Sequence, residues 1–107
     1  MFTSVLIANR GEIAVRVARA CADLGIKSVA VYAPEDRDAL HVRVADQSYV
    51  LPGETAADTY LCAEAVVAVA LKAQVQAVHP GYGFLAESAH FAQLVLDAGL
   101  AWVGPPP

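Results

Sequence analysis

Two short segments of the sequence carry residues that could do chemistry, and each follows an apolar run. The first is residues 9–12, Asn-Arg-Gly-Glu, which open a stretch of helical periodicity. The start of a helix offers free backbone N–H groups and the positive end of a dipole, and both favour an anion. Asn9 could instead cap this helix, with Glu12 at the third position, where a capping box places an acid. Capping leaves Arg10 unexplained.

The second segment, residues 81–86, reads Gly-Tyr-Gly-Phe-Leu-Ala and matches the dinucleotide-binding pattern G-x-G-x-x-G/A. That pattern belongs in the first strand-to-helix turn, with a carboxylate about 20 residues later. Here it follows the fourth predicted strand, and residues 101–103 contain no carboxylate. Nicotinamide or flavin binding is therefore a weak alternative. Because glycines flank Tyr82, its ring either faces a partner or ligand, or packs on the same domain.

The remaining titratable residues form no recognisable catalytic group. His41, His79 and His90 lack metal-ligand spacing and have no cluster of acids or cysteines around them. His79, which precedes Pro80, is either a structural histidine, the interpretation we favour, or a base. The sequence contains no nucleophile elbow and no Walker A loop. We therefore expect no catalytic residue and no metal site within this chain.

Composition limits the class of protein. The chain has 107 residues, of which 57% are hydrophobic and 17% charged, and a net charge of −4. This predicts one folded domain with no electrostatic reason to bind nucleic acid or an anionic membrane. No apolar run approaches the roughly 20 residues of a membrane span, and no signal peptide is recognisable, so we expect a cytoplasmic location. Cys21 and Cys62 are interpreted as buried core residues.

Apolar periodicity then predicts the elements that position the two segments. Short continuous apolar runs predict buried strands, and a spacing of three and four predicts helices, as for Ile13, Val17, Cys21 and Leu24. The alternation predicts an α/β fold: a Rossmann-like, three-layer αβα domain with a five-stranded parallel sheet. The predicted strands are 4–8, 28–32, 47–51, 75–79 and 100–103, and the predicted helices are 12–24, 55–72 and 87–98, with a helical turn within 36–45. The prolines at 105–107 suggest a domain boundary.

Several motifs, in order, resemble the N-terminal domain of biotin carboxylases. Residues 7–14 (IANRGEIA) resemble the opening of that family, and residues 79–85 (HPGYGFL) resemble its second signature. The family's intermediate motifs and its exit at residues 102–105 (WVGP) also match, so the resemblance covers the whole chain, residues 1–107. One departure is Ser88, where the family usually has Asn; serine can still cap a helix.

The resemblance implies an ATP-dependent ligase, the biotin carboxylase component of a biotin-dependent carboxylase. ATP and Mg2+ would activate bicarbonate to carboxyphosphate, and the carboxyl group would move to biotin on a carrier domain. In that family the catalytic groups lie downstream, in an ATP-grasp region, so this pre-ATP-grasp domain would form one wall of the cleft and would be inactive alone. The implied partners are the ATP-grasp domain, the biotin carboxyl carrier domain, a carboxyltransferase and a second copy in a homodimer.

Carried over position by position, the resemblance implies roles for particular residues. Tyr82 and Gly83 would face biotin. The residues that would line or brace the same cleft are Asn9, Arg10, Gly11 and Glu87. We add the hypothesis of an ion pair between Arg10 and Glu87, because both lie at strand ends.

Arg16, Arg19 and Asp23 share one face of the first predicted helix. This is either a solvated face with an intrahelical pair or, as the resemblance implies for Arg19 and Asp23, part of a dimer interface. Two further functions stay open: a free-standing interaction module and a small nucleotide-binding domain. The final acceptor of the carboxyl group is not indicated by the sequence.

Overall fold

A five-stranded parallel sheet forms the centre of the computed structural model, which describes residues 2–104. The strands are β1 (Ser4–Ile7), β2 (Lys27–Tyr32), β3 (Gln47–Val50), β4 (Ala77–His79) and β5 (Ala101–Trp102). They are ordered β3-β2-β1-β4-β5, and every pairing is parallel. The predicted strands agree to within two residues at each end, and the α/β prediction is confirmed. The predicted boundary at residues 105–107 lies outside the described residues.

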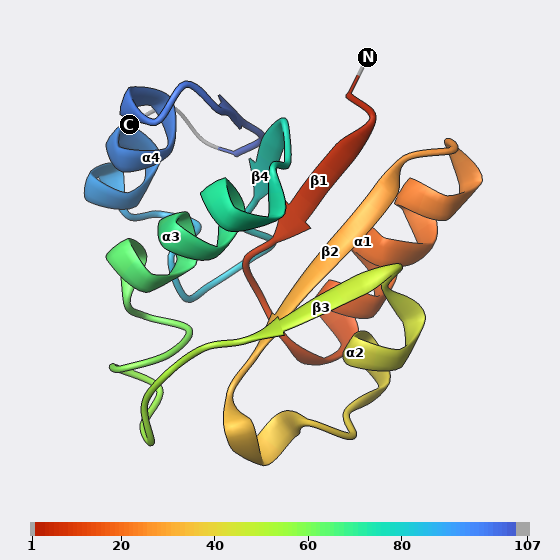
Figure 1. Cartoon of the computed structure of the whole chain (residues 1–107), viewed down its shortest axis with the longest axis horizontal. Coiled ribbons are helices and arrows are strands. Elements are labelled where there is room, and N and C mark those ends of the chain that lie inside the picture. The colour runs from red at the N-terminus through yellow and green to blue at the C-terminus, as the bar shows by residue number, and fades with distance from the viewer. Residues whose placement is uncertain (1, 105–107) are drawn as a thin grey trace.

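Helices cover both faces of this sheet (Figure 1). α1 (Gly11–Asp23) and α2 (Leu40–Val44) lie on one face, and α3 (Ala63–Ala73) and α4 (Ala89–Asp97) lie on the other. A short 3-10 helix, η1 (Pro34–Asp36), follows β2. No helix of the described residues is long and apolar enough to cross a membrane.

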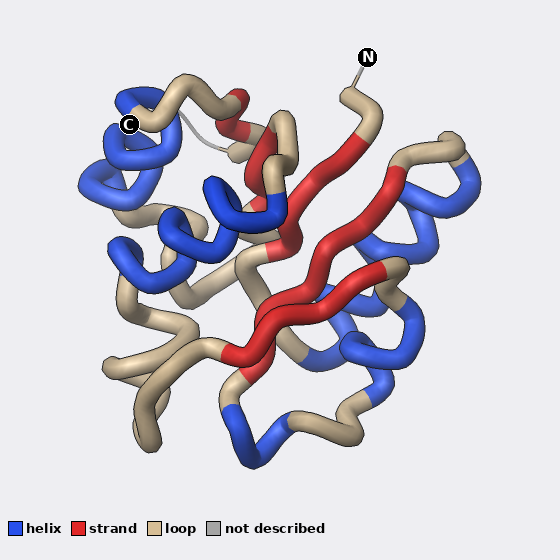
Figure 2. Tube along the Cα trace, viewed as in Figure 1, coloured by secondary structure: helices blue, strands red, loops and turns tan. Residues whose placement is uncertain are grey.

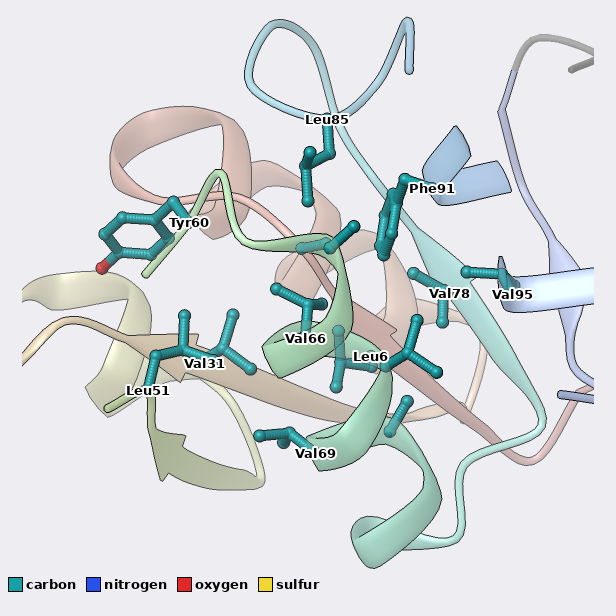
Figure 3. Close-up of a cluster of buried hydrophobic side chains, with 14 of the residues drawn as sticks. Leu6, Val31, Leu51, Tyr60, Val66, Val69, Val78, Leu85, Phe91 and Val95 are labelled. Atoms are coloured by element: carbon teal, nitrogen blue, oxygen red, sulfur yellow. The ribbon is translucent and has the colours of Figure 1, made fainter. Parts of the chain in front are cut away.

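The central strand β1 shows why the strands are continuously apolar. Leu6 belongs to the large cluster beneath α3 and α4, whereas Val5 and Ile7 pack toward α1. Successive side chains of a strand point to opposite faces, and here both faces are covered. Figure 3 shows the larger cluster, in which Phe91 of α4 is completely buried and packs edge-on against Trp102 of β5.

One predicted helix is wrong at its start. α3 begins at Ala63, and residues 55–62, predicted as helical, form turns (Figure 2). The side chain of Thr55 accepts a hydrogen bond from the backbone N–H of Asp58, and the hydroxyl of Thr59 donates to the carbonyl of Thr55. Such local side-chain bonds offer the backbone an alternative to a helix, and they outweigh the helical propensity of the alanines nearby. Cys62 then precedes α3 and is only partly buried, unlike the buried Cys21.

His41 is the most buried titratable side chain of the α1–α2 face. Only 2% of it is exposed, and its Nε2 atom donates to the carbonyl oxygen of Val31 at 3.1 Å. Its Nδ1 atom is buried and has no hydrogen-bond partner among the described residues. A protonated ring would therefore leave a buried N–H group unpaired, which is unfavourable.

This burial predicts a pH-dependent stability. Burial lowers the pKa of His41 from its ordinary value of 6.5, so on acidification the unfolded chain takes up the proton first. The free energy of unfolding should therefore fall as the pH drops from 6.5 toward the folded-state pKa. His41→Gln keeps a donor for Val31 without titrating, and urea unfolding from pH 8 to pH 5 should show a shallower loss of stability. Parallel curves for the two proteins would refute the role of His41.

Candidate functional site

The candidate site lies at the carboxyl ends of β1 and β4. These strands are neighbours, with Leu6 paired to Val78, although about 70 residues separate them. The chain order of the sheet reverses between them, since β1 is followed outward by β2 and β3 on one side and β4 is followed by β5 on the other. Ligands of open α/β sheets bind in the crevice outside such a reversal. The segments that begin at Asn9 and at Pro80 both start there.

Asn9 joins these two segments. Its side chain is 1% exposed, and its Nδ2 atom donates to the carbonyl oxygens of Pro80 at 2.9 Å and Tyr82 at 2.7 Å. Its Oδ1 atom accepts the backbone N–H of Arg10. Both amide hydrogens therefore hold the loop after β4, and the bond that the Asn9 side chain accepts within the described part of the chain is a local one.

Of the two interpretations of residues 9–12, capping of the first helix by Asn9 is therefore wrong. The N-cap residue of α1 is Arg10, without a side-chain cap, and Asn9 lies one position earlier. Asn9 is drawn away from capping because its amide satisfies two carbonyl groups of the other loop. Glu12 pairs with Arg16 one turn along α1, at 2.9 Å, instead of completing a capping box. Ser88, by contrast, caps α4 through the backbone N–H of Phe91, as predicted.

Gly81 lies directly against Asn9. Its φ is +66°, and a Cβ atom there would lie 2.7 Å from Asn9 Nδ2 and 2.8 Å from a methyl carbon of Ile13. Its backbone N–H donates to Nδ1 of His79 at 3.0 Å. Burial also lowers the pKa of His79. Because the Nδ1 lone pair is already occupied, the structure favours the structural interpretation of His79.

Tyr82 projects from this loop, with 77% of its surface exposed. This exposure excludes the alternative that the ring packs on the same domain, and the alternative that it faces a partner or ligand stays a prediction. The ring borders a hollow of about 310 Å³, whose lining includes Gly83, Glu87 and Val103. Neither the Tyr82 nor the Gly83 backbone N–H donates a hydrogen bond within the described residues. The hollow is therefore lined by an exposed aromatic residue and by two residues whose backbone N–H groups have no acceptor among residues 2–104.

A larger apolar groove of about 410 Å³ adjoins the hollow along α1 and shares three of its lining residues, His79, Tyr82 and Val103. The predicted apolar stripe of the first helix lines this groove: Ile13, Val17, Cys21 and Leu24. Arg16 is the one cationic residue of the lining. Few polar groups converge on the groove, so the smaller hollow is the better candidate for specific recognition.

Arg10 does not contribute to the hollow. Its guanidinium makes two hydrogen bonds to Asp36, of 2.8 and 3.0 Å, so the hypothesised Arg10–Glu87 ion pair is wrong. The hydrogen bond to Asp36 raises the pKa of Arg10. Burial alone would raise the pKa of Asp36, but hydrogen bonds from Tyr60 and Arg10 outweigh it, so that pKa is lowered. The sequence does contain a signal for this partner, because Asp36 is an acidic residue shortly after β2, and β2 lies beside β1 in the sheet.

The structure brings some of the other predicted site residues together and leaves the rest apart. Asn9, Tyr82, Gly83 and Glu87 come together around the loop after β4. Gly11 is the exposed first residue of α1, with a φ of +64°. Arg19 and Asp23 are exposed farther along α1, away from the hollow. Among residues 2–104, no group of three His, Cys, Asp or Glu side chains is arranged to hold a metal ion.

The pattern at residues 81–86 does not open a helix. α4 begins only at Ala89, after Ser88, and the segment between consists of turns. In a dinucleotide fold the glycines lead directly into the helix whose N-terminus receives the pyrophosphate. The loop therefore lacks the geometry that this alternative requires.

Comparison with known proteins agrees with this geometry. The family described as "Biotin carboxylase, N-terminal domain" matches residues 1–107. The chain is 57% identical over 103 residues to a biotin-dependent acyl-coenzyme A carboxylase alpha3 subunit of Mycobacterium leprae, covering 96% of this chain and 17% of that protein. It is 50% identical over 105 residues to Biotin carboxylase 1 of Bacillus subtilis, covering 98% and 23%.

A solved structure gives the same result. The biotin carboxylase domain of 2-oxoglutarate carboxylase from Hydrogenobacter thermophilus, a dimer in complex with MgADP, ADP and bicarbonate, superposes with a TM-score of 0.93. It is 51% identical, covering 99% of this chain and 23% of that one. The sheet order and the loop held by Asn9 thus define an α/β domain with a candidate site at its strand reversal. The chain belongs to the biotin carboxylase N-terminal domain family, and it spans about a fifth of the length of these relatives.

Two glycines of the loop offer a matched test of the Asn9 contact. Gly81→Ala should destabilise the protein more than Gly83→Ala, because both have positive φ but only Gly81 is packed against a side chain. Gly83→Ala should lose about 1 kcal/mol through backbone strain alone, and Gly81→Ala at least about 1 kcal/mol more. Urea unfolding of both variants measures the difference. Equal losses would contradict a close packing of Asn9 beneath Gly81.

Proposed function

We propose that this chain is the N-terminal domain of the biotin carboxylase component of a biotin-dependent carboxylase. In that enzyme bicarbonate is activated with ATP, and its carboxyl group is transferred to a ureido nitrogen of biotin on a carrier domain. The observation that carries the proposal is the loop after β4, clasped by Asn9 so that Tyr82 stands exposed beside free backbone donors. The domain supplies one wall of the cleft.

The chemistry of the hollow suits biotin. The Tyr82 ring offers an apolar face to a flat bicyclic ring system. The N–H groups of Tyr82 and Gly83 could donate to a ureido carbonyl oxygen, which accepts two hydrogen bonds. Asn9 holds the loop from beneath, and Glu87 lines the hollow. These residues bind and orient; none is placed to transfer a proton.

ATP, Mg2+ and bicarbonate are assigned to the rest of the enzyme. The described residues hold no acid cluster for a metal ion, and phosphoryl transfer depends on positioned cations and metal ions. The related domain from Hydrogenobacter thermophilus was solved with MgADP and bicarbonate, which supports these ligands for the complete protein. The complete protein would also contain an ATP-grasp region, work with a carrier and a carboxyltransferase, and act in the cytoplasm.

A hybrid enzyme tests the biotin-facing role. This chain replaces the matching segment of Biotin carboxylase 1 from Bacillus subtilis, and bicarbonate-dependent ATP hydrolysis is measured with free biotin as acceptor. Tyr82→Ala should raise the KM for biotin about tenfold, the loss of about 1.4 kcal/mol of binding, and should leave the KM for ATP unchanged. The control is Leu71→Ala, which truncates a large apolar side chain on α3 that is 51% exposed.

The hybrid enzyme gives different results if the biotin assignment fails and if the enzymatic proposal fails. An active hybrid whose KM for biotin is unaffected by Tyr82→Ala would refute the assignment of this ring to biotin. An inactive hybrid, from a chain that folds by itself, would argue against the enzymatic proposal.

We also propose that Arg19 and Asp23 belong to a dimer interface. Both are exposed on α1, and neither forms an ion pair among the described residues, whereas Arg16 on the same helix pairs with Glu12. In the hybrid, Arg19→Glu should shift sedimentation at micromolar concentration toward the monomer, because it sets a like charge against the partner surface. Lys72→Glu makes the same charge change on α3 and should leave the dimer intact. Identical sedimentation of the two variants would support a solvated face.

A further inference from the structure

Tyr60 contacts the loop after β4 at Phe84, beyond the two residues that Asn9 binds. It lies in the turns before α3, and its side chain is 4% exposed. Its ring centroid is 5.5 Å from that of Phe84, with the two planes tilted by 40°. In Figure 3 the Tyr60 ring lies at the edge of the buried cluster, with its hydroxyl oxygen directed away from the aliphatic side chains. The ring thus packs against the loop at Phe84.

The hydroxyl group fixes the ring at its far end. It donates to Oδ2 of Asp36 at 2.7 Å and accepts the backbone N–H of Ala33 at 3.0 Å. Burial, together with the hydrogen bond to Asp36, raises the pKa of Tyr60 to about 12. The phenol therefore stays protonated and keeps donating throughout the physiological range. Both hydrogen bonds end on the segment that follows β2.

Arg10 completes this arrangement. It holds Asp36 through two hydrogen bonds, and its guanidinium carbon lies 5.6 Å from the centroid of the Tyr60 ring. A cation at that distance from an aromatic face is attracted to it. The segments after β1 and β2 and the turns before α3 are therefore joined in one polar network, and the Tyr60 ring carries it to Phe84.

Phe84 needs such a support. Its φ is +46°, a left-handed conformation that is unfavourable for a bulky residue without glycine's freedom. The hydrogen bonds from Asn9 hold the loop at Pro80 and Tyr82, and both residues precede Phe84. A strained backbone conformation persists only where its surroundings determine it, and such residues gather at ligand-binding segments. Within residues 2–104, the aromatic ring that contacts Phe84 is that of Tyr60. This contact is therefore a candidate for the support that the strained backbone requires.

We infer that Tyr60 is a positioning residue, which acts through Phe84 to hold the loop that presents Tyr82 and Gly83. The network of Arg10, Asp36 and the Tyr60 hydroxyl fixes the ring. This inference rests on the proposed function only for the identity of the ligand, biotin. The holding of the loop itself is independent of what binds there.

Amide hydrogen exchange tests the holding of the loop directly. The N–H groups of Ala86 and Ser88 donate to Gly83 and Leu85 within the loop and report its order. In the full chain, Tyr60→Leu should accelerate their exchange about tenfold. Tyr60→Phe, which keeps the ring but loses the hydroxyl, should have a smaller effect. The control is Tyr49→Leu on β3, a partly buried tyrosine whose ring faces Lys72 instead. Phe84→Leu provides a second variant that removes the same contact from the loop side.

Kinetics of the hybrid enzyme supply the second measurement. Tyr60→Leu should raise the KM for biotin about tenfold and leave the KM for ATP within about twofold, since misplacing a binding group weakens its own ligand. A merely structural role would lower kcat through loss of active enzyme and would leave both KM values unchanged.

The two measurements distinguish the possible failures. Unchanged exchange at Ala86 and Ser88 in both Tyr60→Leu and Phe84→Leu would overturn the inference, whatever the loop binds. Accelerated exchange with an unchanged KM for biotin would support the positioning role and refute the proposed biotin site.

Discussion

The carboxamide of Asn9 is the contact on which the arrangement of the site depends. β1 and β4 can pair through their backbones without it, but nothing in strand pairing dictates the course of the chain beyond Pro80. Asn9 dictates it, because one buried Nδ2 atom binds two carbonyl oxygens of the loop, at 2.9 and 2.7 Å. A buried amide with both hydrogens satisfied favours one backbone conformation strongly, since every alternative leaves a polar group unpaired. Only a residue without Cβ fits over it, and that residue is Gly81.

The pair of Arg10 and Asp36 has a different character. Arg10 is about half exposed, so the pair is screened by water and adds little to global stability. Its geometry is nevertheless well defined, because two parallel hydrogen bonds fix the carboxylate that in turn accepts from Tyr60. The contribution of this pair is orientation more than stabilisation. It joins the loop after β1 to the aromatic pair of Tyr60 and Phe84.

The sequence predicted the strands well because their signal is local. A strand buried on both faces must be apolar at every position, and β1, β2 and β4 meet that condition over most of their length. The start of α3 was missed because Thr55 and Thr59 bond to neighbouring backbone groups, a choice that alanine-rich composition conceals. Side-chain partners were predicted least well. Asn9 binds carbonyl groups more than 70 residues away, and Arg10 binds an acid 26 residues away. The spacing of apolar residues along the chain therefore predicts neither partner.

The glycine spacing at residues 81–86 illustrates how one pattern can have two causes. In a dinucleotide-binding turn the glycines admit a pyrophosphate to the start of a helix. Here Gly81 and Gly83 both have positive φ, the first because it packs on Asn9 and the second because the chain must reverse around the exposed Tyr82. Phe84 continues in the same left-handed region and is held by its contact with Tyr60. The loop therefore presents one aromatic side chain between two segments that are held by other residues, and its resemblance to a dinucleotide-binding turn is confined to the spacing of its glycines, because no helix begins directly after them.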